Sequence, residues 1–467
     1  MSRLLATVGL LVFVVVGLVV LAAGGALPGS GGISPRSDGS AAPSPAESPH
    51  PAGRTALVAT GSPSATRPVT PAPSPDRVAS AVSYVRADLA SGTREGVALG
   101  GGALVLDNTG LSTGRYVDPH GMPARPRLAA VPFESGAWTS SWTEAPFAFD
   151  ELIASWAVAT PPGTWVRIEV QARGAGRDTK WYSLGVWASG DADLRRTSER
   201  QQQDADGTVE VDTFVRRGAP LDGYRLRATL HRRAGTPASP VLRAASAMVS
   251  KKATYTIPSP WSGAAVDLAV PTLSQETHTG HYPEYDGGGE AWCSPTSTAM
   301  VLRFFGSGPS AADLAAFPGS EHADGAVDHA ARHTYDWSYR GAGNWAFNTA
   351  HAATYGLDAF VTRLRSLVEA QRFIEAGIPL IASINGELPG FLLGKTNGHL
   401  LVIRGFTASG DVVVNDPAVL ANAAARKIYA RGDFERVWLE GSGGVVYVIR
   451  PFGVPLPANT PSLPENW

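Results

Sequence analysis

The sequence contains only one cysteine, Cys293, among 467 residues. An internal disulfide and a cysteine-rich metal site are therefore excluded. Lysine is also scarce, with five among the 39 basic residues, which we attribute to genome composition rather than to function. The net charge of −2 leaves no basic excess to neutralise phosphates, so we expect no nucleic-acid partner.

Aromatic side chains are absent from residues 29–78, where ten prolines and nine serines accumulate. Such a stretch cannot bury enough apolar surface to offset its chain entropy, so we expect a disordered Pro/Ser/Ala-rich linker at 28–79. The rest of the chain is long enough, and with 44% apolar residues hydrophobic enough, for two folded regions. We expect these regions at 80–255 and 262–455, followed by a C-terminal tail at 456–467.

The chain begins with a pattern that is typical of exported proteins. Arg3 precedes an almost unbroken apolar run at 4–23, and small residues follow this run. The pattern describes a secretory signal, and the run is also long enough to cross a bilayer as a helix. We expect residues 1–27 to be a signal peptide or a membrane anchor, with cleavage favoured. The protein is then secreted or held at the cell surface.

Apolar and polar residues alternate in the first folded region, at 165–171, 209–212 and 224–230, with turn residues between these segments. This alternation predicts half-buried antiparallel strands and an N-terminal all-β sandwich. Six of the twelve tryptophans lie in the region, and we expect most of them in its core rather than exposed for ligand binding.

Helical periodicity comes first in the second folded region and strand patterns follow it. Helices are predicted at 297–305, 311–316, 345–355 and 367–376, and strands at 379–384, 399–406, 411–415 and 444–449. This order predicts an α+β domain.

Cys293 stands where a glycine-rich loop meets the first of these helices. Pro295 suits a first helical turn and Gly306 a helix end, so the cysteine is predicted at the helix N-terminus. Unpaired N–H groups and the helix dipole favour a thiolate there. An inert, buried cysteine would fit the same position equally well.

A general base is predicted on a β-hairpin that contains His399 and Asp416. With a two- or four-residue loop centred on Ser409 and Gly410, paired residue numbers add to an odd total, as do 399 and 416. The two side chains are then opposite or diagonal neighbours on one face of the sheet. Asp416 could orient the imidazole, with His399 as the base and Cys293 as the nucleophile.

The remaining histidines show no ligand spacing with the cysteine. His329 and His333 are four residues apart, as zinc ligands on a helix can be, but no third ligand is evident. We therefore expect no metal and no cofactor.

At the three site residues the chain resembles papain-fold cysteine peptidases of the bacteriocin-processing, C39-like type, in particular secreted actinobacterial members. The resemblance covers roughly residues 265–450 and rests on Trp292 to Ser297, Gly398 to Val402 and Asn415 to Ala418, with 341–348 as a further similar segment. It implies a papain-like domain, a catalytic triad of Cys293, His399 and Asp416, and a peptide or cell-wall peptide as substrate.

The sequence departs from this family at the oxyanion donor. The family places a glutamine a few residues before the cysteine, whereas Gly287 stands six residues upstream here. The nearest glutamine is Gln275, and we propose that a longer loop, 276–290, separates it from the cysteine. Gln275 and the backbone N–H of Cys293 would then hold the oxyanion.

Three functions follow from these observations. The favoured one is an exported cysteine peptidase that acts through a thioester acyl-enzyme. The second is a peptidoglycan amidase, which the Pro/Ser-rich stalk would suit. The third is a non-enzymatic cell-surface binding protein with a degenerate papain-like domain, supported by the displaced glutamine and opposed by the presence of all three triad residue types.

Overall fold

The computed structural model describes residues 81–121, 130–251, 253–317, 322–392 and 394–467. The predicted targeting segment, 1–27, and the predicted linker, 28–79, lie outside these residues. Within the described ranges no helix is both long and apolar enough to cross a membrane.

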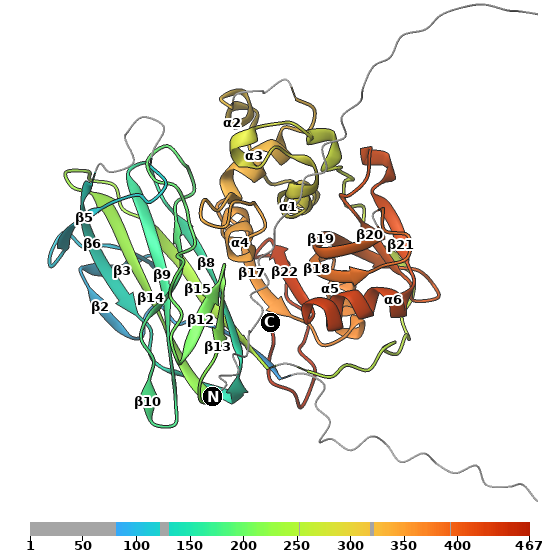
Figure 1. The fold of residues 1–467 in the computed structure, drawn as a ribbon, viewed down its shortest axis with the longest axis horizontal. Coiled ribbons are helices and arrows are strands. Elements are labelled where there is room, and N and C mark those ends of the chain that lie inside the picture. Colours follow the sequence, from blue (N-terminus) through green and yellow to red (C-terminus); the bar gives the residue numbers. More distant parts are fainter. Residues whose placement is uncertain (1–80, 122–129, 252, 318–321, 393) are drawn as a thin grey trace, which may run out of the picture. The chain divides into compact units, whose positions relative to one another are not determined.

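The N-terminal region consists of two antiparallel sheets (Figure 1). The first has the order β12 (Gly207–Glu210), β13 (Thr213–Arg216), β8 (Glu151–Ala159), β15 (Val241–Ser250), β4 (Ala103–Leu106) and β3 (Val97–Gly100), and β1 (Val82–Arg86) pairs with β15. The second has the order β10 (Arg177–Asp178), β9 (Thr164–Gly174), β14 (Leu221–Arg233), β6 (Val131–Thr139) and β2 (Thr93–Glu95). On this second sheet β11 (Tyr182–Trp187) pairs with β9, β5 (Ser112–Tyr116) with β6, and β7 (Thr143–Phe149) with β14.

Side chains from both sheets meet in one hydrophobic core. Trp138 and Trp187 of the second sheet and Trp156 of the first are almost completely buried in it. Trp142 and Trp181 remain half-buried, and the guanidinium of Arg225 lies 4.7 and 5.3 Å from their ring centroids. Most of the tryptophans in this region are therefore core residues, as expected from their size.

The C-terminal region contains one antiparallel sheet and several helices. The sheet has the order β17 (Asp358–Arg363), β22 (Val445–Arg450), β18 (Leu380–Glu387), β19 (Lys395–Phe406), β20 (Val412–Asn415) and β21 (Arg426–Tyr429), and β16 (Val266–Asp267) pairs with β19. The α-helices are α1 (Cys293–Phe304), α2 (Ala311–Ala315), α3 (Ala326–Thr334), α4 (Trp345–Ala353), α5 (Leu367–Glu375) and α6 (Arg431–Glu435). Shorter helical turns are η1 (Glu276–His278), η2 (Pro283–Tyr285), η3 (Gly289–Trp292), η4 (Asn422–Ala424) and η5 (Arg436–Glu440).

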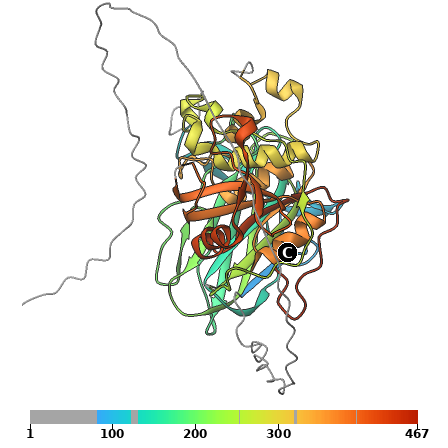
Figure 2. The ribbon, with the colours of Figure 1, turned by 90° about the vertical axis from the view of Figure 1, so that its right-hand side faces the viewer.

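The central strand β19 is covered on both faces. All residues from His399 to Phe406 are buried, and both α1 and α5 contact the strand. Figure 2 shows the orange and red strands of this sheet with helices above and below them in the view. A strand that is covered on both faces becomes continuously apolar rather than alternating, which is what Leu400 to Ile403 show.

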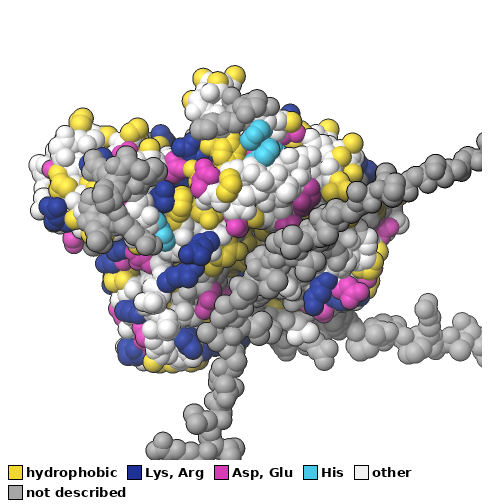
Figure 3. Space-filling model, turned by 45° about the horizontal axis from the view of Figure 1, so that its top comes forward, with side chains coloured by type: hydrophobic (Ala, Val, Ile, Leu, Met, Phe, Trp, Pro, Cys, Tyr) yellow, Lys and Arg dark blue, Asp and Glu magenta, His cyan; other side chains and the backbone are white. Residues whose placement is uncertain are grey.

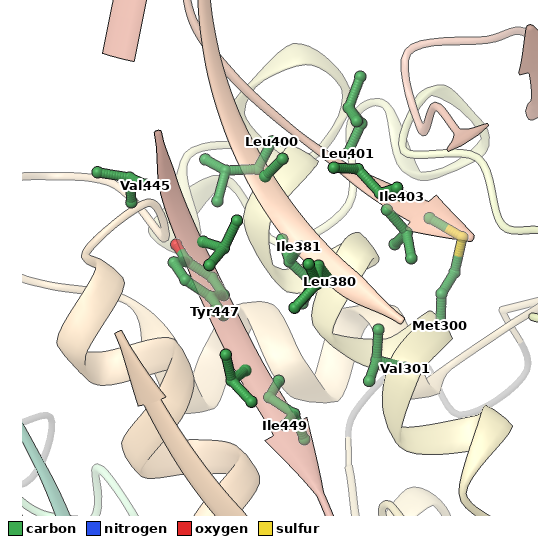
Figure 4. Close-up of a cluster of buried hydrophobic side chains, with 14 of the residues drawn as sticks. Met300, Val301, Leu380, Ile381, Leu400, Leu401, Ile403, Val445, Tyr447 and Ile449 are labelled. Atoms are coloured by element: carbon green, nitrogen blue, oxygen red, sulfur yellow. The ribbon is translucent and has the colours of Figure 1, made fainter. Parts of the chain in front are cut away.

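Helix α1 holds its place through an apolar face that packs on this sheet. Figure 4 shows Met300 and Val301 of α1 among buried side chains of the three central strands, namely Leu380 and Ile381 of β18, Leu400, Leu401 and Ile403 of β19, and Val445, Tyr447 and Ile449 of β22. The Ser297 hydroxyl also donates a hydrogen bond to the Leu400 carbonyl (3.2 Å). The helix that begins at Cys293 is thereby fixed against the strand that carries His399.

The two folded regions share part of their packing. Phe347 of α4 is fully buried in the core of the N-terminal region, with its ring centroid 6.2 Å from that of Trp156 and 5.3 Å from that of Trp187. The Trp345 backbone N–H, in the first turn of the same helix, donates to the Asp212 carboxylate (2.5 Å). Helix α4 is therefore anchored at its start by an acidic side chain of the N-terminal region.

The last residues of the chain, the predicted C-terminal tail at 456–467, pack on the C-terminal region. Asn466 is fully buried and accepts a hydrogen bond from Arg365 (2.8 Å), and Trp467 packs against Phe373 of α5 with ring centroids 4.9 Å apart. Segment 456–467 thus completes the C-terminal region, through partners that are about 100 positions away in the sequence.

A β-rich N-terminal domain therefore precedes a C-terminal domain of helices and one sheet, and at this level the predicted architecture is confirmed. Acidic and basic side chains are interspersed on the face in Figure 3.

Candidate active site

Cys293 is the first residue of α1, as the sequence predicts, and it is half-buried. Three consecutive glycines, 287–289, lead to η3 and all have positive φ. A Cβ at Gly288 would lie 1.9 Å from the His278 carbonyl oxygen, so only glycine fits there. Trp292 is fully buried and donates its indole N–H to the Tyr285 carbonyl (2.8 Å). The glycine loop and this tryptophan together fix the position at which the helix begins.

The hairpin brings His399 and Asp416 together, but through a different register from the predicted one. Near the turn Phe406 pairs with Val412, which leaves a five-residue loop, and the paired numbers add to an even total. A β-bulge between Ile403 and Gly405 then shifts the register, so that Ile403 pairs with Val414 and the total becomes odd. The predicted two- or four-residue loop is therefore wrong. The predicted relation holds because the bulge restores the parity and makes His399 and Asp416 diagonal neighbours.

The His399 imidazole donates from Nε2 to the Asp416 Oδ1 at 2.8 Å, and both side chains are almost completely buried. Because Asp416 takes Nε2, Nδ1 is the ring nitrogen that remains for Cys293, and the interaction with Cys293 is among the causes that raise the pKa of His399. The second Asp416 oxygen, Oδ2, accepts from the Tyr429 hydroxyl (2.7 Å) and from the Lys427 ammonium (3.2 Å). The structure thus joins His399 to Asp416 by a hydrogen bond and gives Asp416 two further donors. The charge of Cys293, at the start of α1, acts on the same ring.

The electrostatics around the hairpin favour a protonated His399 paired with an ionised Asp416. Burial lowers the pKa of His399, but hydrogen bonds to Asp416 and Cys293 and their negative charges outweigh it and raise the pKa to about 10. Burial raises the pKa of Asp416. This effect is outweighed by the hydrogen bond and charge of His399, the charge of Lys427 and the hydrogen bond from Tyr429, which lower the pKa to about 2. At neutral pH the imidazole is therefore protonated and the carboxylate ionised.

Gln275, the predicted oxyanion donor, is buried next to the hairpin. Its backbone N–H donates to the Pro417 carbonyl (2.9 Å), which attaches it to the residue after Asp416. Its side-chain Nε2 donates to the Glu276 carboxylate (3.0 Å), and among the described residues Oε1 has no hydrogen-bond partner. Among the described residues the amide therefore keeps unused hydrogen-bonding capacity, at Oε1 and at the second N–H of Nε2.

Several residues around the triad are not among the predicted ones. Lys427 and Tyr429 alternate on β21, which pairs with the strand before Asp416, so period-two spacing on a recognised strand would have indicated them. Phe391, in the loop between β18 and β19, packs on the imidazole with ring centroids 5.1 Å apart. Burial first, and then the charge of Cys293, raises the pKa of Tyr339.

His329 and His333, for which the sequence shows no third ligand, lie beside a third histidine, His351. His329 and His333 stack at 3.9 Å between ring centroids, with His351 5.8 Å from His333, and burial lowers the pKa of all three rings. Over the described part of the chain, the side chains whose ligand atoms converge are instead His278, His281 and Asp328.

The chain matches two family models that together span both folded regions. Residues 81–250 match the Peptidase C39 N-terminal domain, and residues 267–445 match the Peptidase C39 like family. No curated protein matches the chain.

The chain is also similar to solved structures that are described as a C39-like peptidase and as forms of interpain A. A protein described as a C39-like peptidase from Bacillus anthracis is 20% identical, with a TM-score of 0.27, over 40% of this chain and 98% of that one. The active interpain A cysteine protease of Prevotella intermedia is 18% identical, with a TM-score of 0.27, over 41% and 98% of the two chains. A prointerpain A fragment from the same organism is 16% identical, with a TM-score of 0.26, over 42% and 76%.

Proposed function

Since the chain carries the two domains of a C39-like peptidase, we propose that it is an exported cysteine peptidase that hydrolyses peptide or amide bonds. The observation that carries the proposal is the buried His399–Asp416 hydrogen bond, beside Cys293 at the start of α1, whose charge acts on the His399 ring. With this proposal we assign the N-terminal sheets to a β-sandwich and the C-terminal domain to the α+β papain-like class. Export rests on the sequence pattern of residues 1–27.

The proposed reaction follows from the roles that the three groups can fill. The Cys293 thiolate attacks the carbonyl carbon of the scissile bond, and the carbonyl oxygen becomes an oxyanion. The His399 imidazolium then donates its proton to the leaving amine, which departs and leaves a thioester. In the second half His399 takes a proton from water, which attacks the thioester, so that the carboxylic acid is released and Cys293 is regenerated. Asp416 orients the ring and stabilises its cation throughout.

The oxyanion is the part of the proposal that depends on Gln275. Its free amide N–H and the backbone N–H of Cys293 are the two donors that we assign to it. The alternative of a non-enzymatic binding protein finds its support at the same residue, because the Gln275 amide already donates to Glu276.

The proposal is tested by the reactivity of the thiol. The full chain is labelled with an iodoacetamide probe between about pH 5 and pH 9, beside His399→Ala and, as a matched control, His120→Ala in the N-terminal domain. Fast labelling at about pH 6 that is lost in His399→Ala but kept in His120→Ala is the expected result. Labelling that rises only near the free-thiol pKa of about 8.5, and equally in all three proteins, would contradict an activated cysteine.

A substrate screen distinguishes the remaining alternatives. Quenched fluorescent peptides and peptidoglycan fragments are each incubated with the wild-type chain and with Cys293→Ala. Cleavage of peptides that depends on Cys293 supports the peptidase, and cleavage confined to wall fragments supports the amidase. An activated thiol with neither activity leaves the binding protein as the better description.

A further inference from the structure

We propose that His278, His281 and Asp328 form a binding site for a divalent transition metal, with Zn²⁺ as the best fit. The two histidines belong to the loop between Gln275 and Cys293, and the aspartate is on α3. Two imidazoles and one carboxylate are a frequent zinc ligand set, with a fourth position left for water or another side chain. The inference rests on this geometry alone and does not depend on the proposed peptidase activity.

The ligand atoms already converge. The Nδ1 atoms of His278 and His281 lie 3.1 and 3.0 Å from the same carboxylate oxygen, Oδ1 of Asp328. Ligands at about 2.0–2.2 Å from a tetrahedral zinc are separated from each other by about 3.3–3.6 Å. A metal could therefore replace the protons on these nitrogens with little movement of the side chains.

The charge balance also favours a cation. Asp328 is 1% exposed, and within the described ranges its ion-pair partners are histidines alone, without any lysine or arginine. Its second oxygen, Oδ2, has no hydrogen-bond partner among the described residues. A buried carboxylate is costly unless it is paired, and a divalent cation would satisfy both its charge and its free oxygen.

The surroundings supply access and a further ligand. His281 is about one-fifth exposed, which gives an ion a way in, whereas His278 and Asp328 hold the interior side of the site. His322 stacks on His281 at 3.6 Å between ring centroids, and its Nδ1 lies 3.8 Å from Oδ2 of Asp328. That nitrogen also has no hydrogen-bond partner among the described residues. His322 is therefore placed next to the open coordination position.

A metal here would brace the loop that joins two parts of the active site. The ring centroid of His278 lies 6.0 Å from that of Trp292, the residue before Cys293. The backbone carbonyl of His278 is the group that a Cβ at position 288 would meet, so it restricts that position to glycine. Coordination would tie this loop to α3, which packs on α1. The site is thus structural, and its effect on the active site is one of position.

The test is metal binding by the full chain with Cys293→Ala, because the thiol and His399 could otherwise bind the same ion. Co²⁺ is added to the metal-free protein and its visible absorption is followed, and Zn²⁺ affinity is measured by competition with a chromogenic chelator. His281→Gln is the ligand variant, chosen because its side chain is partly exposed, and His333→Gln is the matched control from the stacked cluster.

One equivalent of Co²⁺ with tetrahedral absorption, displaced by Zn²⁺, is expected. Affinity should fall by at least about 10–100-fold in His281→Gln, since even the loss of an outer partner of a ligand has an effect of that size. His333→Gln should bind as tightly as the parent. Absence of stoichiometric binding by the parent, or equal affinity in both variants, would overturn the proposal.

Discussion

Replacing Asp416 with asparagine removes the negative charge that faces the buried His399 ring, while the shape of the side chain is kept. The asparagine can still accept a hydrogen bond from Nε2, so the ring keeps its orientation. The change isolates what the charge does to the protonation of His399.

The magnitude follows from the two partners of the ring. Burial lowers the pKa of His399, whereas Asp416 and Cys293 raise it. The net effect is a rise in the pKa from 6.5 to about 10. This difference of about 3.5 corresponds to roughly 5 kcal/mol in favour of the imidazolium. A hydrogen bond to a charged group contributes about 1.5–3 kcal/mol and a neutral one about 0.5–1.5 kcal/mol, so Asp416→Asn should lower the His399 pKa by about 1, to roughly 9.

The assay is a pH titration of ¹³C-labelled histidine by NMR, in which the His399 signal is assigned by its absence in His399→Gln. The matched control is Asp433→Asn, which removes a carboxylate from α6 that pairs with Arg436. The control should leave the titration unchanged. A His399 pKa that is the same in Asp416→Asn as in the wild type would refute the argument that this carboxylate stabilises the imidazolium.

Three further predictions concern stability and the glycine loop. Because the pKa of His399 is raised in the folded state, its stabilising contribution is complete below about pH 6.5 and is lost as the pH rises through about 10. In urea unfolding, the stability advantage of the wild type over His399→Gln should therefore shrink across that range. An advantage that stays constant would contradict the linkage. Phe347→Ala should lower the free energy of unfolding by about 3–5 kcal/mol, because it opens a cavity where α4 enters the N-terminal core. A loss well under about 1 kcal/mol, measured by urea unfolding, would show that the side chain is not buried there. Gly288→Ala should slow alkylation of Cys293 far more than Gly287→Ala. Both positions have positive φ, but only at Gly288 would the new Cβ meet the His278 carbonyl oxygen, at 1.9 Å. Equal alkylation rates in the two variants would contradict this account of the loop.

The sequence alone was sufficient for the parts of the site that depend on local patterns. A glycine-rich loop, Pro295 in the first turn and an apolar stripe predicted Cys293 at a helix N-terminus, because capping and helical periodicity act over a few residues. Alternation and turn residues predicted the hairpin, and with it the shared face of His399 and Asp416. Each of these predictions required only residues that are close together in the chain.

Tertiary structure decided what depends on residues far apart in the sequence. The bulge between Ile403 and Gly405 sets the register of the hairpin, and the local sequence at these two residues does not predict a bulge. Asp328 reaches His278 and His281 from about 50 positions away, and the chain end at Asn466 and Trp467 docks on α5 and its surroundings from about 100. Such contacts form because burying a charge or a large ring requires a partner, and only the folded chain determines which distant residue supplies it.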